Sequence, residues 1–238
     1  MIGRSPRLDS PAVVLTAAIG LTLYALILAS PQVVSLAQRI IGGSQESINS
    51  YGLRFAASAV LLGLAPVVVL RASGARSSDI GLRKARRIRP TLLLFACVIA
   101  VSVGVLSSRN TELATFYPFG RPGILEIARS PLWIFGHSLS YLVFYYLPWE
   151  ITFRGVLLFP LIPRRGAGAS GVLLAVTPQA IASTLLHIGH PSMEIAAALP
   201  FGLALGLLAV RTGSILPGLL IHAGVGIALD VAIMVTSF

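Results

Sequence analysis

Long apolar stretches, separated by short polar segments, limit this chain to one broad class of fold. The chain has 238 residues, a mean hydropathy of +0.87 and only 11% charged residues. Soluble domains carry about 25% charged residues. The stretches are long enough to cross a bilayer as helices, and they lack the alternation of apolar and polar residues that marks a membrane barrel. The sequence therefore predicts an all-α, polytopic bundle of about seven to eight transmembrane helices.

We expect a single transmembrane domain over residues 1–238, divided into seven spans. The predicted spans are residues 11–29, 51–70, 90–106, 131–163, 171–188, 191–210 and 214–235. The fourth span is longer than one crossing requires, and Pro148 and Pro160 are places where it can kink or end. An eighth helix would lie within residues 30–50 or after Pro160.

Basic residues cluster in loops that the predicted topology places on one side of the membrane. Seven of them lie between Arg71 and Arg89, and smaller clusters occur at Arg4, Arg164 and Arg211. Cytoplasmic loops are enriched in Lys and Arg, so these loops are predicted to be cytoplasmic. The net charge of +10 then reflects orientation and contact with anionic lipid headgroups, and no nucleic-acid partner is expected.

Glu150 and Arg154 place two ionisable side chains inside the fourth predicted span. At a spacing of i and i+4 they share one helix face and can form an ion pair. Because charge is costly to bury at membrane depth, such residues are rarely kept there without a role. Two interpretations stay open: a structural pair that locks the helix, or a carboxylate that activates water while the arginine holds it.

His187, His190 and Glu194 follow at the junction of the fifth and sixth spans. His187 alone is typical of a hydrogen bond between membrane helices. Pro191 suits the first position of the sixth helix, so Glu194 falls in the first turn, where the helix dipole favours a carboxylate. Glu194 is therefore a capping residue or a catalytic acid, and the two histidines with Glu194 could also ligate a metal.

His222 lies in the middle of the last span, where nothing local explains a polar side chain. We expect it to face a partner in the bundle interior. Asp230 follows two turns later on the same face. Helix rise places these two residues, Glu150 and His187 about 16–28 Å from the cytoplasmic ends, so we expect them to converge on one site. His137 is predicted to face away from it.

Three short motifs stand on the fourth, fifth and seventh predicted spans: Trp-Glu-Ile-Thr-Phe-Arg at 149–154, Ser-Thr-Leu-Leu-His at 183–187 and His-Ala-Gly-Val-Gly at 222–226. They resemble the Glu-Glu-xxx-Arg, Phe-xxx-His and His-xxx-Asn/Asp motifs of the CPBP intramembrane proteases, also called the type II CAAX prenyl endopeptidase or Abi family. The resemblance covers roughly residues 132–230, within a family-like core expected over 131–235.

Three positions depart from the family pattern. Trp149 stands in place of the first glutamate, which the resemblance implies is a main activator of water. Ser183 replaces the phenylalanine, and Gly226 replaces the last Asn or Asp. Glu194 and Asp230 are the candidates to supply the missing acid and amide.

The resemblance implies an intramembrane endopeptidase that hydrolyses membrane-associated or lipidated peptides. In this interpretation Glu150 deprotonates a water beside His187 and is held by Arg154. His222 stabilises the oxyanion that develops on the scissile carbonyl. No cofactor is required, although Zn²⁺ held by His187, His222 and a glutamate is the alternative. Glutamate-type and metal-dependent chemistry both stay open.

A non-catalytic membrane protein on the same scaffold is the alternative function, and Trp149 favours it. Such a protein would serve bacteriocin immunity, peptide binding or a chaperone role. A transporter is disfavoured because the sequence shows no inverted repeat. The expected partners are a peptide or membrane-protein substrate and the lipid bilayer, in the plasma membrane of a bacterium. The sequence identifies neither the substrate nor the oligomeric state.

Overall fold

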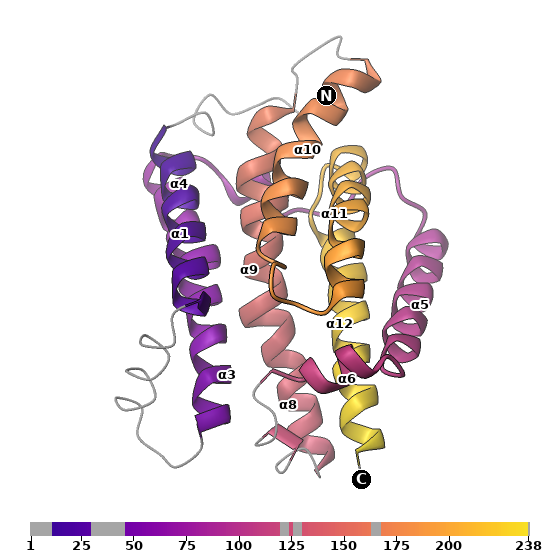
Figure 1. The fold of residues 1–238 in the computed structure, drawn as a ribbon. Helices are drawn as coiled ribbons and strands as arrows, with labels where there is room; N and C mark the ends of the chain where they lie inside the picture. The colour runs from indigo at the N-terminus through magenta and orange to yellow at the C-terminus, as the bar shows by residue number, and fades with distance from the viewer. Residues whose placement is uncertain (1–10, 30–45, 120–123, 126–129, 163–167, 238) are drawn as a thin grey trace.

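The computed structural model describes residues 11–29, 46–119, 124–125, 130–162 and 168–237, and the statements below refer to these residues. Their regular elements are all helices, and no strand occurs among them (Figure 1). The prediction of an all-α helix bundle is confirmed.

The first half of the bundle consists of α1 (Pro11–Ala29), α3 (Glu46–Ala57), a π-helical segment (Ser58–Leu64), α4 (Ala65–Ala72), a 3₁₀ turn (Ser77–Ile80), α5 (Pro90–Ser107) and α6 (Thr111–Phe116). The second half consists of α8 (Pro131–Tyr141), a π-helical segment (Leu142–Tyr146), α9 (Leu147–Glu150), a second π-helical segment (Ile151–Leu158), a 3₁₀ turn (Phe159–Leu161), α10 (Ala169–Leu185), α11 (Ser192–Thr212) and α12 (Leu216–Thr236).

Within the described residues, five helices are long and apolar enough to cross a membrane: Gly52–Ala72, Pro90–Ser107, Pro131–Leu161, Ser192–Thr212 and Leu216–Thr236. Two shorter apolar helices, Leu15–Ile27 and Ala169–Leu185, occupy the other two predicted spans. Residues 30–45 and 163–167, where an eighth helix was considered, lie outside the described residues. A short helix that the sequence did not predict, α6, lies in the loop after α5.

In two of the spans a π-helical segment precedes a proline, and the helix continues past that proline. A π-helical segment precedes Pro148 in the fourth span, and the helix continues to Leu161. In the second span Pro66 lacks an N–H, so the carbonyl of Leu62 four residues earlier loses that helical donor. The hydroxyl of Thr152 donates a 2.6 Å hydrogen bond to this carbonyl instead. The bond ties the second span to the fourth, two residues from Glu150.

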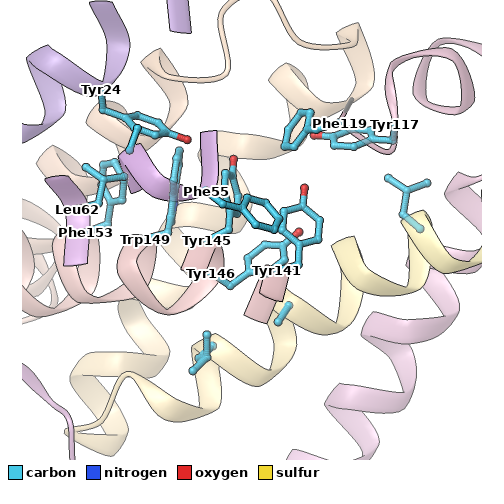
Figure 2. Packing of buried hydrophobic residues seen from close by; sticks show 14 of the residues in the cluster. Tyr24, Phe55, Leu62, Tyr117, Phe119, Tyr141, Tyr145, Tyr146, Trp149 and Phe153 are labelled. Carbon is cyan, nitrogen blue, oxygen red and sulfur yellow. The ribbon is translucent and has the colours of Figure 1, made fainter. Parts of the chain in front are cut away.

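A column of aromatic side chains runs along the fourth span (Figure 2). Tyr145 stacks on Trp149 with ring centroids 5.9 Å apart, and Trp149 in turn contacts Phe153 at 4.7 Å. Tyr24 of α1 meets the edge of Trp149 at 6.5 Å. Aromatic side chains bury large areas, so this column supplies much of the core between the first and fourth spans.

The basic loop after α4 packs against the turn between α11 and α12. Arg83 Nε donates a 2.7 Å hydrogen bond to the carbonyl of Gly213, and the Ile215 N–H donates one of 3.0 Å to the carbonyl of Gly81. Gly81 has a φ of +75°, and a Cβ there would lie 2.7 Å from the ring of Phe159, so glycine is required. Figure 1 places α6 toward the opposite end of the bundle.

Candidate active site

A cavity of about 260 Å³ lies between α5, α6, α11 and α12. Most of its wall is apolar, with Val103 from α5, Phe201 from α11 and Leu229 from α12. Its polar wall residues are Ser107, Tyr117, Tyr146, His187, Glu194 and His222. Two histidines and one carboxylate that the sequence singled out therefore share this cavity, although they come from different helices.

Glu194 projects from the first turn of α11 into the cavity wall, and three side chains surround its carboxylate. The hydroxyl of Tyr117 lies 2.9 and 2.8 Å from the two carboxylate oxygens and donates to them. His190 Nδ1 lies 3.0 Å from Oε1, and His187 Nε2 lies 3.5 Å from the same oxygen. The carboxylate is thus held by a network of side chains, which is more than helix capping requires.

The α6 segment contributes Leu113 and the adjoining Tyr117 to the cavity wall. Asn110 caps α6, because its side chain accepts a 3.1 Å hydrogen bond from the Leu113 N–H. Burial, followed by the nearby charge of Glu194, raises the pKa of Tyr117 well above its usual value. The phenol of Tyr117 therefore keeps its proton and remains a donor to Glu194.

Glu112, a carboxylate on α6, caps the start of α11, the helix that carries Glu194. Glu112 Oε2 accepts hydrogen bonds from the N–H of Ser192, at 3.0 Å, and from its hydroxyl, at 2.7 Å. These two bonds lower the pKa of Glu112 from its ordinary value of 4.5. Because Pro191 at the N-cap has no capping side chain, the carboxylate from α6 satisfies a backbone N–H at the start of α11.

The orientation of His187 follows from a backbone contact. Its Nδ1 lies 2.8 Å from the carbonyl of Ser183 one turn earlier, so Nδ1–H donates and Nε2 faces Glu194. The ring of Trp149 approaches His187 edge-on, with centroids 5.6 Å apart. Trp149 therefore lies beside this histidine as packing, while the carboxylate approaches from α11.

Glu150 belongs to a separate network, and its own side chain is fully buried behind the cavity wall. Its Oε1 lies 2.9 Å from His222 Nδ1 and 3.2 Å from an Arg154 nitrogen, and its side chain has 0% exposure. A Cβ at Gly218 would lie 3.3 Å from Glu150 Oε2, so the glycine leaves room for the carboxylate. The predicted pair of Glu150 and Arg154 is present, but Glu150 reaches the cavity only through His222.

Asp230 does not line the cavity, contrary to the expected convergence. Its Oδ2 lies 2.9 Å from His137 Nε2, and both side chains are buried. His137 is outside the cavity, as the helix spacing predicted, but its pairing with Asp230 was missed because the partners lie on α8 and α12. The geometry gives Asp230 a helix-joining contact and no place beside His222 as a substitute amide.

The residues considered for Zn²⁺ are His187, His222 and a glutamate. Over the described ranges, no group of three His, Cys, Asp or Glu side chains is arranged to hold a metal ion. His222 turns Nδ1 to Glu150, and His187 turns Nδ1 to a backbone carbonyl. Each histidine therefore has Nε2 left to contact a ligand in the cavity.

Comparison with protein families gives one match. Residues 131–228 match the family model described as Type II CAAX prenyl endopeptidase Rce1-like. Comparisons with curated proteins and with solved structures each find no match. The matched segment contains all three sequence motifs together with Glu194, so the resemblance drawn from those motifs is confirmed.

Proposed function

Because residues 131–228 belong to the Rce1-like family of type II CAAX prenyl endopeptidases, we propose that this membrane protein hydrolyses a peptide bond of membrane-associated or lipidated peptides. One observation carries the proposal: two carboxylate–histidine pairs, Glu194 with His187 and Glu150 with His222, meet at a single cavity. Both histidines lie in its wall, so a peptide carbonyl held there has an acid–base pair on each side.

Glu194 and His187 activate the attacking water in this proposal. The carboxylate lies in the cavity wall, and its Oε1 faces His187 Nε2 at 3.5 Å. As the water oxygen bonds to the scissile carbon, its proton passes to this pair and is held between the two atoms. The same proton is then delivered to the amide nitrogen as the C–N bond breaks. Glu194 so takes the role of the family glutamate that Trp149 replaces.

Glu150 acts through His222 in this proposal and does not touch the water. Its carboxylate accepts a hydrogen bond from His222 Nδ1–H at 2.9 Å, which fixes the orientation of the ring. The imidazolium form of the ring, which carries a proton on each nitrogen, presents Nε2–H to the oxyanion on the scissile carbonyl. Arg154 holds Glu150 in place from the same helix face.

The chemistry of the cavity favours apolar residues on either side of the scissile bond. Its wall includes Val103, Met193, Phe201 and Leu229, and the polar groups form the smaller part of the lining. Such a cavity suits a segment that already lies in or on the bilayer.

We place the protein in the plasma membrane of a bacterium, with the basic loops on the cytoplasmic side. A cysteine at Ser78 should then resist an impermeant thiol reagent added to intact cells, while one at Thr115, exposed on α6, should react. The reverse labelling pattern would show that the protein has the opposite orientation in the membrane.

The decisive experiment measures cleavage of a library of apolar peptides by the purified protein in detergent. Glu194→Gln keeps the shape of the side chain and removes its charge, so turnover should fall roughly 10²-fold or more while thermal stability changes little. Asp230→Asn is the matched control, since it alters a buried acid outside the cavity, and turnover should be retained. Full activity of Glu194→Gln would remove Glu194 from the mechanism.

The second candidate is a non-catalytic peptide-binding protein on the same scaffold. Trp149 favours it, because the side chain at the position of the family glutamate is 3% exposed and packed within the aromatic column. This candidate predicts that wild-type protein binds apolar peptides without cleaving any of them.

A further inference from the structure

Gly226 lies one turn after His222 in the cavity wall. The packing leaves no room for a side chain at this position. A Cβ at this position would overlap the hydroxyl oxygen of Tyr146 and lie 2.7 Å from the ring carbon that bears it. The phenol of Tyr146 therefore fills the space that any side chain at position 226 would occupy. In the third motif of the family this position carries Asn or Asp, so a polar group is present here but comes from a different helix.

Tyr146 brings that polar group to the cavity from the fourth span. It ends the π-helical segment Leu142–Tyr146, four residues before Glu150, and it lies in the cavity wall with His222. The two rings meet edge to face, with centroids 4.8 Å apart and an interplanar angle of 65°. Its side chain is also hydrogen-bonded to that of Tyr141, its neighbour in Figure 2. These contacts hold the ring and the hydroxyl oxygen of Tyr146 beside the imidazole.

We propose that Tyr146 is a catalytic residue whose hydroxyl donates a hydrogen bond to the oxyanion, beside His222 Nε2–H. This assignment rests on the proposed peptide hydrolysis. When the water oxygen bonds to the scissile carbon, the electron pair of the C=O π bond moves onto the carbonyl oxygen. The two donors face that oxygen and keep their own protons. The electron pair returns to re-form the carbonyl as the C–N bond breaks, and the nitrogen receives the proton held by Glu194 and His187.

Tyr117, the other phenol in the cavity wall, does not suit this role. Its hydroxyl already donates to both oxygens of Glu194, at 2.9 and 2.8 Å. A hydroxyl has a single proton, so a donor committed to the carboxylate cannot also serve the oxyanion. Tyr146 contacts the ring of His222 instead, on the side of the cavity where the oxyanion is expected.

Removing the hydroxyl alone tests the assignment. Tyr146→Phe keeps the ring and its packing, so kcat should fall about 10²- to 10³-fold, as expected for loss of one oxyanion donor, with KM and the melting temperature little changed. Tyr145→Phe is the matched control. Tyr145 is the adjacent tyrosine and is also buried, but it does not line the cavity, so its variant should keep wild-type kcat.

A rescue experiment separates chemistry from packing. Tyr146→Ala frees the space beside Gly226, and adding Gly226→Asn to that variant supplies an amide donor from α12. The double variant should recover at least about tenfold of the kcat lost by Tyr146→Ala, since a restored donor returns part of the electrostatic stabilisation. A side chain that served only packing would show no such recovery in kcat.

The outcomes distinguish the two proposals. If Tyr146→Phe retains wild-type kcat while Glu194→Gln loses it, the assignment of Tyr146 is overturned and the proposed hydrolysis stands. If the double variant is no faster than Tyr146→Ala, the oxyanion role is likewise overturned. If the wild-type protein cleaves no peptide, both proposals fail together.

Discussion

Glu150 and Glu194 each pair with a histidine of the same cavity, but their surroundings differ. Glu150 has 0% exposure, shares one oxygen with Arg154 and His222, and lies behind the cavity wall. The side chain of Glu194 is 22% exposed and lies in the wall itself, with neutral or basic partners around it. The sequence motif contains Glu150, whereas Glu194 is the carboxylate that lines the cavity. In the proposed mechanism, the reactive carboxylate therefore lies on α11 and not on the helix that carries the Glu150 motif.

The largest expected difference between the two carboxylates is the effect of their substitution on the free energy of unfolding. Glu150→Ala leaves Arg154 buried without its counter-charge, which should lower the free energy of unfolding by about 3–5 kcal/mol. Replacing both residues by leucine should recover most of this loss, because no unpaired charge remains. Glu194→Ala should cost much less. Unfolding by SDS titration in mixed micelles measures all three variants. Equal losses for Glu150→Ala and Glu194→Ala would contradict the distinction.

The fold was largely predictable because each membrane helix appears in the sequence as a long apolar stretch. The span predicted at residues 90–106 is observed as α5, Pro90–Ser107, and the one predicted at 191–210 as α11, Ser192–Thr212. Pairs within one helix were also predictable, since the i and i+4 spacing of Glu150 and Arg154 fixes their common face.

Contacts between helices were not predictable in this way. Tyr117 meets Glu194 across 77 residues, and His137 meets Asp230 across 93 residues. Tyr146 lies in an apolar run, where nothing in the pattern separates a catalytic phenol from an aromatic core residue. Position 226 was the one available signal, because a glycine where the family has a polar side chain indicates that something else fills the space.

A third carboxylate–histidine pair, Asp230 with His137, is buried like Glu150 but has no contact with the cavity through either residue. Asp230 and His137 are both buried and lie outside the cavity. Asp230→Ala leaves His137 without this partner and should lower the free energy of unfolding by about 1–3 kcal/mol, while kcat is retained. SDS titration and peptide cleavage on the same preparations measure the two effects. A loss of kcat that exceeds the loss of folded protein would move Asp230 into the mechanism.

Tyr117 tests whether Glu194 depends on its hydrogen-bond network. Tyr117→Phe removes a donor to a charged group, an interaction that contributes about 1.5–3 kcal/mol, so kcat/KM should fall roughly 10- to 100-fold. Phe116→Leu is the control: it alters the neighbouring aromatic residue on α6 and leaves the hydroxyl in place. If the two variants lose activity equally, packing of α6 explains the effect and the hydroxyl does not.

The smallest expected effect concerns Glu112, a fully exposed carboxylate on the same segment. Its two hydrogen bonds from Ser192 lower its pKa in the folded protein below the ordinary 4.5. The unfolded chain therefore takes up this proton at a higher pH than the folded one. The stabilisation is fully present above pH 4.5 and is lost as the pH falls through the lower, native pKa. Glu112→Gln lacks this titration. Its melting temperature should lie slightly below that of the wild type at neutral pH and approach it in acid, with kcat unchanged throughout. A difference in melting temperature that stays constant from neutral pH down to about 3 would show that the charge of Glu112 does not hold the start of α11.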